Sequence, residues 1–180
     1  MGAERLFAWA LLTLWSTWLF ALQGILAAGG SLGTRSPDMG VLLLLMLDRR
    51  CSRSSMLFAV LIVSSARMGF SADPPLAILF GYALLVGGMR LLRRVVEVDQ
   101  ALIRALIAGL GFLALNKYWA MARGIALAQG AGQVTSASVW TRELPAGSWG
   151  QALSTALGIL ILGPILMHLP GLSPLRRGQR

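Results

Sequence analysis

Ionisable side chains within or beside long apolar segments are the residues of this sequence best placed to do chemistry. Arg67 and Lys117 lie inside apolar runs, and Asp38 and Asp73 stand next to prolines at the edges of such runs. A charge at the centre of a membrane costs about 2.5–3.5 kcal/mol even on the more lenient insertion scale. Two interpretations follow. In the first, Arg67 and Lys117 reach outward to lipid headgroups, with Asp73 near Arg67. In the second, they form a polar cluster with Asp38, Asn116 and Asp73, which supports a cavity or docks another protein.

Few residues are available for acid–base or nucleophilic catalysis. The chain has one histidine, His168, and one cysteine, Cys51, so a histidine-pair metal site and a disulfide framework are excluded. No carboxylate lies in the middle of an apolar run, which argues against a proton-coupled pump or an intramembrane aspartyl protease. We therefore expect no enzymatic activity, no metal and no cofactor.

Apolar composition sets the class of protein. Of 180 residues, 56% are hydrophobic and 13% are charged, against roughly 25% charged residues in a soluble domain. The apolar residues come in blocks long enough to cross a bilayer as helices. This composition excludes a soluble enzyme and a nucleic-acid reader despite the net charge of +9. We expect an all-α integral membrane protein whose first partner is the lipid bilayer.

Six apolar segments predict six transmembrane helices in a single membrane domain that takes in residues 1–180. The approximate spans are 6–28, 39–50, 55–70, 75–92, 101–122 and 151–169. The second is short, because the nine apolar residues from Met39 to Leu47 cover about 14 Å, roughly half of the hydrocarbon thickness. In the sixth, Pro164 removes a backbone hydrogen bond and predicts a bend near Leu160.

The arginine distribution predicts the orientation. With six spans and the N-terminus inside, eleven basic residues lie at the cytoplasmic face and five lie outside or near the outer interface. Cytoplasmic loops carry such an excess of Lys and Arg. We therefore predict that both termini are cytoplasmic, with residues 49–53 on the same side.

Two helix faces are candidate surfaces for another membrane helix. Small residues spaced by four let helix backbones approach closely, and Ala101, Ala105 and Gly109 form such a row. Trp15 and Trp18 share a face of the first helix. The alternative use of the small residues is packing within the bundle itself. The candidate partner-interface residues are Trp15, Trp18, Asp38, Arg67, Ala101, Ala105, Gly109 and Lys117.

The order of features resembles a known family. Pro37-Asp38 opens an unbroken aliphatic helix, a proline-containing outer turn covers 69–75, and the fourth span ends in the glycine- and arginine-rich segment 87–94. Over nearly the whole chain this resembles the bacterial rod shape-determining protein MreD, as a divergent member with Ser64, Ser65 and Arg67 where the family has a glycine-rich helix and an aspartate.

The resemblance implies a non-catalytic scaffold subunit of the cell-elongation machinery in the bacterial inner membrane. Its partners would be an MreC-like bitopic protein and, indirectly, MreB-like proteins and peptidoglycan synthases. The family's compact bundle is similar to the substrate-binding subunits of energy-coupling-factor vitamin transporters. Such a subunit is therefore the alternative function, with a solute pocket lined by Trp140, Trp149, Asn116 and Arg67 and with residues 130–150 as a lid.

Overall fold

The computed structural model describes residues 3–29, 36–48, 51–94, 100–130, 144, 147–170, 172 and 175. Within these residues every regular element is helical, as the composition predicts. The helices are α1 (Ala3–Ala28), α2 (Met39–Asp48), α3 (Arg53–Met68), α4 (Pro75–Leu92), α5 (Ala101–Gly130), α6 (Ser148–Ile161) and α7 (Gly163–Met167). Residues 49–50, which close the predicted second span, and residues 131–143 of the predicted lid lie outside the described residues.

In the part of the chain that the structure describes, three helices, α1, α4 and α5, are long and apolar enough to cross a membrane. Large apolar side chains cover the outward faces of the bundle, for example Phe7, Trp18, Leu84, Leu106 and Leu157. A protein surrounded by water rarely exposes contiguous apolar surface of this extent. These outer faces are therefore suited to contact with lipid.

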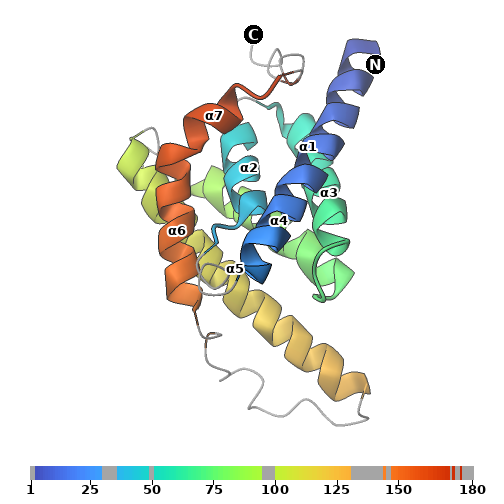
Figure 1. The fold of residues 1–180 in the computed structure, drawn as a ribbon, viewed down its shortest axis with the longest axis vertical. Coiled ribbons are helices and arrows are strands. Elements are labelled where there is room, and N and C mark those ends of the chain that lie inside the picture. Colours follow the sequence, from blue (N-terminus) through green and yellow to red (C-terminus); the bar gives the residue numbers. More distant parts are fainter. Residues whose placement is uncertain are drawn as a thin grey trace.

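Helix α2 lies at the centre of the molecule (Figure 1). All ten of its residues are buried, and it contacts each of the other six helices. A helix that is hydrophobic on every side must be enclosed on every side, and the run from Val41 to Leu47 meets that condition. With ten residues α2 is about 15 Å long, so it extends over roughly half of a bilayer's hydrocarbon thickness.

The outer helices pack around α2 in chain order, with α1 against α3, α3 against α4, α4 against α5 and α5 against α6. Contacts with the two ends of α2 fix their directions. Gln23 and Arg67, late in α1 and α3, lie at the Asp38 end of α2. Tyr82, early in α4, also reaches that end, whereas Arg90, late in α4, reaches Asp48.

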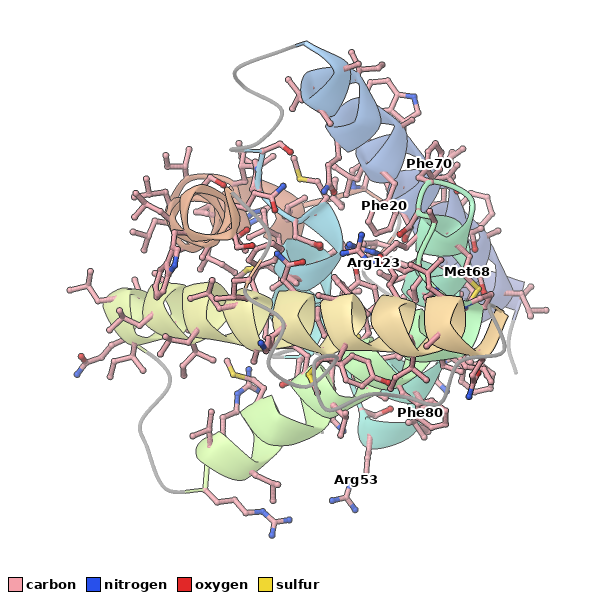
Figure 2. All side chains as sticks on the ribbon, turned by 90° about the horizontal axis from the view of Figure 1, so that it is seen from below. Phe20, Arg53, Met68, Phe70, Phe80 and Arg123 are labelled. Carbon is pink, nitrogen blue, oxygen red and sulfur yellow. The ribbon has the colours of Figure 1, made fainter. Side chains whose placement is uncertain are left out.

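The first four helices therefore alternate in direction. The start of α1 and the end of α7 lie at the same end of the molecule (Figure 1). Helix α5 crosses the full width of the bundle in Figure 2, and its last turns extend beyond the neighbouring helices in Figure 1. It continues past the predicted end at 122 as far as Gly130.

The sixth predicted span is divided in two. Helix α6 ends at Ile161, and α7 begins at Gly163 with Pro164 in its first turn. Proline has no N–H to donate, and the first turn is the helical position where none is required. The predicted bend near Leu160 is thus observed as a helix break centred on Leu162.

Candidate functional site

The N-terminal end of α2 is built around Asp38. Pro37 precedes it, and the Asp38 Oδ1 atom accepts a hydrogen bond from the backbone N–H of Val41 at 2.9 Å. This N-cap satisfies one of the helix donors that have no intrahelical partner. The N–H of Asp38 donates to Thr155 Oγ1 at 3.0 Å, and that of Met39 donates to Gln23 Oε1 at 3.1 Å. The start of α2 is therefore tied to α1 and α6.

An ion pair joins α2 to α3 at the same point. Arg67 Nη1 donates to Asp38 Oδ2 and also to the Tyr82 hydroxyl, the latter at 2.7 Å. The Tyr82 hydroxyl in turn donates to Asp38 Oδ1 at 3.2 Å. The side chains of Asp38 and Arg67 are only 2% and 14% exposed. A carboxylate, a guanidinium and a phenol therefore form a closed triangle inside the bundle.

Aromatic rings cover the arginine. The ring of Trp119 lies 3.9 Å from Arg67 Cζ, and it meets the Tyr82 ring edge-on with 5.5 Å between centroids. Trp119 Nε1 donates to the carbonyl of Ala77 at 3.1 Å, so its polar atom is also satisfied. A guanidinium over an indole face gains cation–π attraction, which is strongest where water is excluded.

Two glycines leave room for these rings. A Cβ on Gly40 would overlap the Tyr82 hydroxyl, and a Cβ on Gly81 would lie 2.8 Å from Trp119 Nε1. We name Asp38, Arg67, Tyr82 and Trp119, with Gln23 and Thr155, the Asp38 cluster. Helices α1, α3, α4, α5 and α6 each contribute one of these side chains, and the sixth, Asp38, is the N-cap of α2.

The other end of α2 carries a second buried carboxylate. Asp48 Oδ1 accepts from Arg90 Nε at 2.6 Å, and Asp48 Oδ2 lies 2.9 Å from Arg93 Nη1. The Asp48 side chain is fully buried, whereas the two arginines are about a quarter exposed. Helix α2 is therefore fixed at both ends by ion pairs to neighbouring helices.

The predicted polar cluster is only partly observed. Arg67 pairs with Asp38, as the second interpretation expects, but Asp73 pairs with Arg123 at 2.9 Å. Asn116 donates to Ser148 Oγ at 2.8 Å, which joins α5 to α6. Asp73 and Asn116 therefore serve other contacts, while Tyr82 and Trp119, which the sequence did not single out as members, complete the cluster.

The predicted partner-interface residues have different surroundings. Trp18 is 62% exposed on α1, whereas Trp15 is half-buried, as is Lys117 on α5. The small-residue row packs inside the chain. Ala101 is exposed, but Ala105 is buried, and a Cβ on Gly109 would lie 3.2 Å from the Ala152 carbonyl of α6.

The residues expected to line a solute pocket are separated or engaged. Arg67 and Asn116 are bound to Asp38 and Ser148, and Trp149 is 71% exposed. Trp140 lies outside the described residues. In the Asp38 cluster, the carboxylate of Asp38, the guanidinium of Arg67 and the hydroxyl of Tyr82 are engaged with one another, so their arrangement joins α2, α3 and α4.

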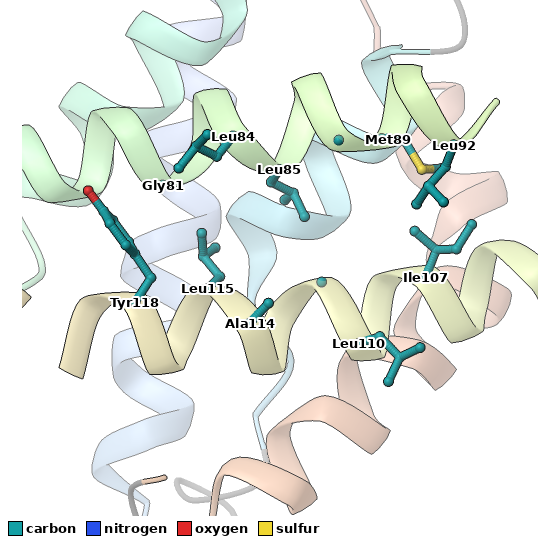
Figure 3. A pocket seen from close by; sticks show the side chains of 12 residues that line it. Gly81, Leu84, Leu85, Met89, Leu92, Ile107, Leu110, Ala114, Leu115 and Tyr118 are labelled. Atoms are coloured by element: carbon teal, nitrogen blue, oxygen red, sulfur yellow. The ribbon is translucent and has the colours of Figure 1, made fainter. Parts of the chain in front are cut away.

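Among the described residues, grooves lie between α4 and α5 and between α3 and α4. The first, of about 390 Å³, separates α4 from α5 and is almost wholly apolar, with Gly81, Gly88 and Gly111 among its lining residues (Figure 3). The second, of about 280 Å³, separates α3 from α4 and carries arginines at one end. Neither groove is lined by a residue of the Asp38 cluster. Gly81, which lines the first groove, lies against Trp119 of the cluster.

No group of three metal-binding side chains is present in the part of the chain that the structure describes. Comparison with family models, with curated proteins and with solved structures finds no match for this chain.

Proposed function

We propose that this chain is a non-catalytic membrane scaffold of the bacterial cell-elongation machinery, an MreD-like subunit that holds the transmembrane helix of an MreC-like bitopic partner. The observation that carries the scaffold role is the Asp38 cluster. Side chains from α1, α3, α4, α5 and α6 converge on the N-cap of α2, and the interior there is filled by an ion pair and two rings. A scaffold needs helices in fixed positions, and this convergence supplies them.

Six membrane crossings with both termini in the cytoplasm complete the proposal. It is supported by the alternating helix directions, by the position of the start of α1 and the end of α7 at one end of the molecule, and by the arginine excess there. In this arrangement α2 is the second crossing. Its buried Asp48, paired with Arg90 and Arg93, lies toward the cytoplasmic side.

Two described surfaces can receive a partner's helix. One is the face of α1 around Trp18, and the other is the α4–α5 groove, where Gly88 and Gly111 reduce the side-chain bulk. Small residues at a helix interface permit close backbone contact, the main source of helix association in lipid. The row at Ala105 and Gly109 is already used against α6.

Site-specific photocrosslinking in the native membrane tests the scaffold function. A photoreactive residue at Trp18 or at Leu110, which lines the α4–α5 groove, should capture one bitopic protein with a periplasmic domain. The matched control position is Leu153, which is equally exposed on α6. Co-isolation of an ATPase with a bound vitamin, in place of a bitopic protein, would refute the scaffold and favour the transporter subunit.

Cysteine labelling tests the orientation separately. In a Cys51→Ser background, a cysteine at Ser54 should resist a membrane-impermeant maleimide added to intact cells, because the start of α3 is cytoplasmic. A cysteine at Ala72, in the turn at the opposite end, should react. Both positions are exposed, so the reversed pattern would refute the orientation.

A further inference from the structure

The α3–α4 groove combines an apolar floor with a basic end. Its lining runs from Leu57, Val60 and Ala83, past Gly87, to Arg53 and Arg94. Gly87 keeps the groove open, because a Cβ at that position would meet no atom within 4 Å. The groove therefore lies between two outer helices and carries positive charge where α3 begins and α4 ends.

The arginines at this end of the groove differ in their ion pairs. Arg90 and Arg93 are bound to Asp48. Arg53 and Arg94 are exposed, and no acidic residue in the described part of the chain pairs with either of them. Figure 2 shows the Arg53 side chain pointing away from the helices. Arg90 and Arg93 thus neutralise Asp48, and Arg53 and Arg94 are left for an external anion.

The start of α3 adds to this positive potential. Arg53 is the first residue of α3, and Ser52 caps the helix by accepting from the N–H of Ser55. A helix N-terminus carries a partial positive charge of about half a unit. The end of α4 lies at the same end of the groove and carries the opposite partial charge, which offsets the contribution of α3. The attraction for an anion therefore comes from the side chains of Arg53 and Arg94.

We propose that the α3–α4 groove binds an anionic phospholipid. Its phosphate would lie between Arg53 and Arg94, and an acyl chain would lie along Leu57 and Ala83 past Gly87. The positive charge at one end and the apolar surface along the rest select this occupant, because an anionic phospholipid carries a phosphate at one end and acyl chains at the other. The argument for this lipid site does not depend on the proposed scaffold function.

Native mass spectrometry of the full chain in detergent tests the site. The protein is incubated with equal amounts of phosphatidylglycerol and phosphatidylcholine of the same acyl composition, and the retained lipids are counted. Each arginine near a membrane surface contributes about a fivefold preference for an anionic lipid. Arg53→Gln and Arg94→Gln should each lower the phosphatidylglycerol preference about fivefold, and the double variant roughly 25-fold. Arg5→Gln, at an exposed position on α1 that does not line the groove, should lower the preference less than either groove variant.

A pair of adjacent glycines tests the apolar part. Gly87→Leu should fill the α3–α4 groove and reduce phosphatidylglycerol retention severalfold with both arginines intact. Gly88→Leu is the matched control, because Gly88 lines the α4–α5 groove and its Cβ would also enter open space. It should leave retention as in the unmodified protein.

Three results would overturn the proposal. They are equal retention of the two lipids by the unmodified protein, an unchanged preference in the double arginine variant, and equal effects of Gly87→Leu and Gly88→Leu. A photocrosslink from Leu57 to a polypeptide in place of lipid would also overturn it. Because both lipids compete for the same folded molecules, a variant that folds poorly lowers both signals together and leaves their ratio readable.

Discussion

Removing one partner of the Asp38–Arg67 ion pair should destabilise the protein far more than removing both. Asp38→Asn keeps the N-cap of α2, because asparagine caps as well as aspartate, but it leaves the Arg67 charge without its counter-ion. A buried pair broken from one side costs about 3–5 kcal/mol. We expect the loss of stability for Asp38→Asn to lie in this range, because the side chains of Asp38 and Arg67 are only 2% and 14% exposed and water can stabilise neither charge.

The neutral double variant should recover much of that loss. Arg67→Met leaves the carboxylate with its contacts from the Val41 N–H and the Tyr82 hydroxyl, and we expect it to cost about 3 kcal/mol. Asp38→Asn with Arg67→Met removes both charges, and replacement of a buried pair by neutral groups is often close to neutral in stability. The coupling between the two sites should therefore exceed about 3 kcal/mol.

Unfolding in mixed micelles provides the assay. The helical circular dichroism signal of the four proteins is followed while the fraction of sodium dodecyl sulfate is raised, and the free energies complete a double-mutant cycle. Residues without mutual interaction give additive changes within about 0.5 kcal/mol. If the loss of stability in the double variant equals the sum of the losses in the two single variants, the conclusion that this pair holds the helices in place is refuted.

Three further predictions concern positions with different surroundings. Gly40→Ala should cost about 1–3 kcal/mol of stability, because the added methyl group overlaps the Tyr82 hydroxyl. Gly24→Ala, whose methyl group enters open space on α1, should stabilise the protein by up to about 1 kcal/mol. Thermal unfolding in detergent compares the two variants, and equal effects would contradict the packing around Gly40. Asp48→Asn should cost about 1.5–3 kcal/mol, less than Asp38→Asn, because its two arginines are about a quarter exposed and can turn to water; the same micelle titration measures it. Arg123→Gln should change stability by less than about 1 kcal/mol, since this side chain is 44% exposed, and a larger loss would show that its ion pair carries more of the fold than its exposure implies.

Helix type and most helix positions follow from the sequence because they depend on local composition. The all-apolar run after Asp38 predicts a short helix, and the structure adds the reason for its composition, which is contact with other helices on every side. The break at Leu162 was predicted as a bend two residues earlier, because Pro164 can either kink a helix or begin a new one. Packing against the neighbours decides between these outcomes.

The membership of the Asp38 cluster follows from the sequence only in part. The cost of an intramembrane charge indicates that Arg67 requires a partner, and Asp38 was one of the candidates. The choice of Asp38 over Asp73 depends on how α2 and α3 cross, which no local spacing encodes. Tyr82 and Trp119 gave no separate signal, although Gly81, next to Tyr82 in the sequence, is the residue that makes room for the indole of Trp119.

The enclosure of α2 has a consequence for biosynthesis. The hydroxyl that receives the Asp38 N–H belongs to Thr155, which follows it by 117 residues. At about 5–20 residues per second of ribosomal elongation, the nascent polypeptide waits on the order of ten seconds for that acceptor. During this interval α2 has to be sheltered by the insertion machinery or by the helices already made. Its enclosure is complete only after α6, which carries Thr155, has been translated.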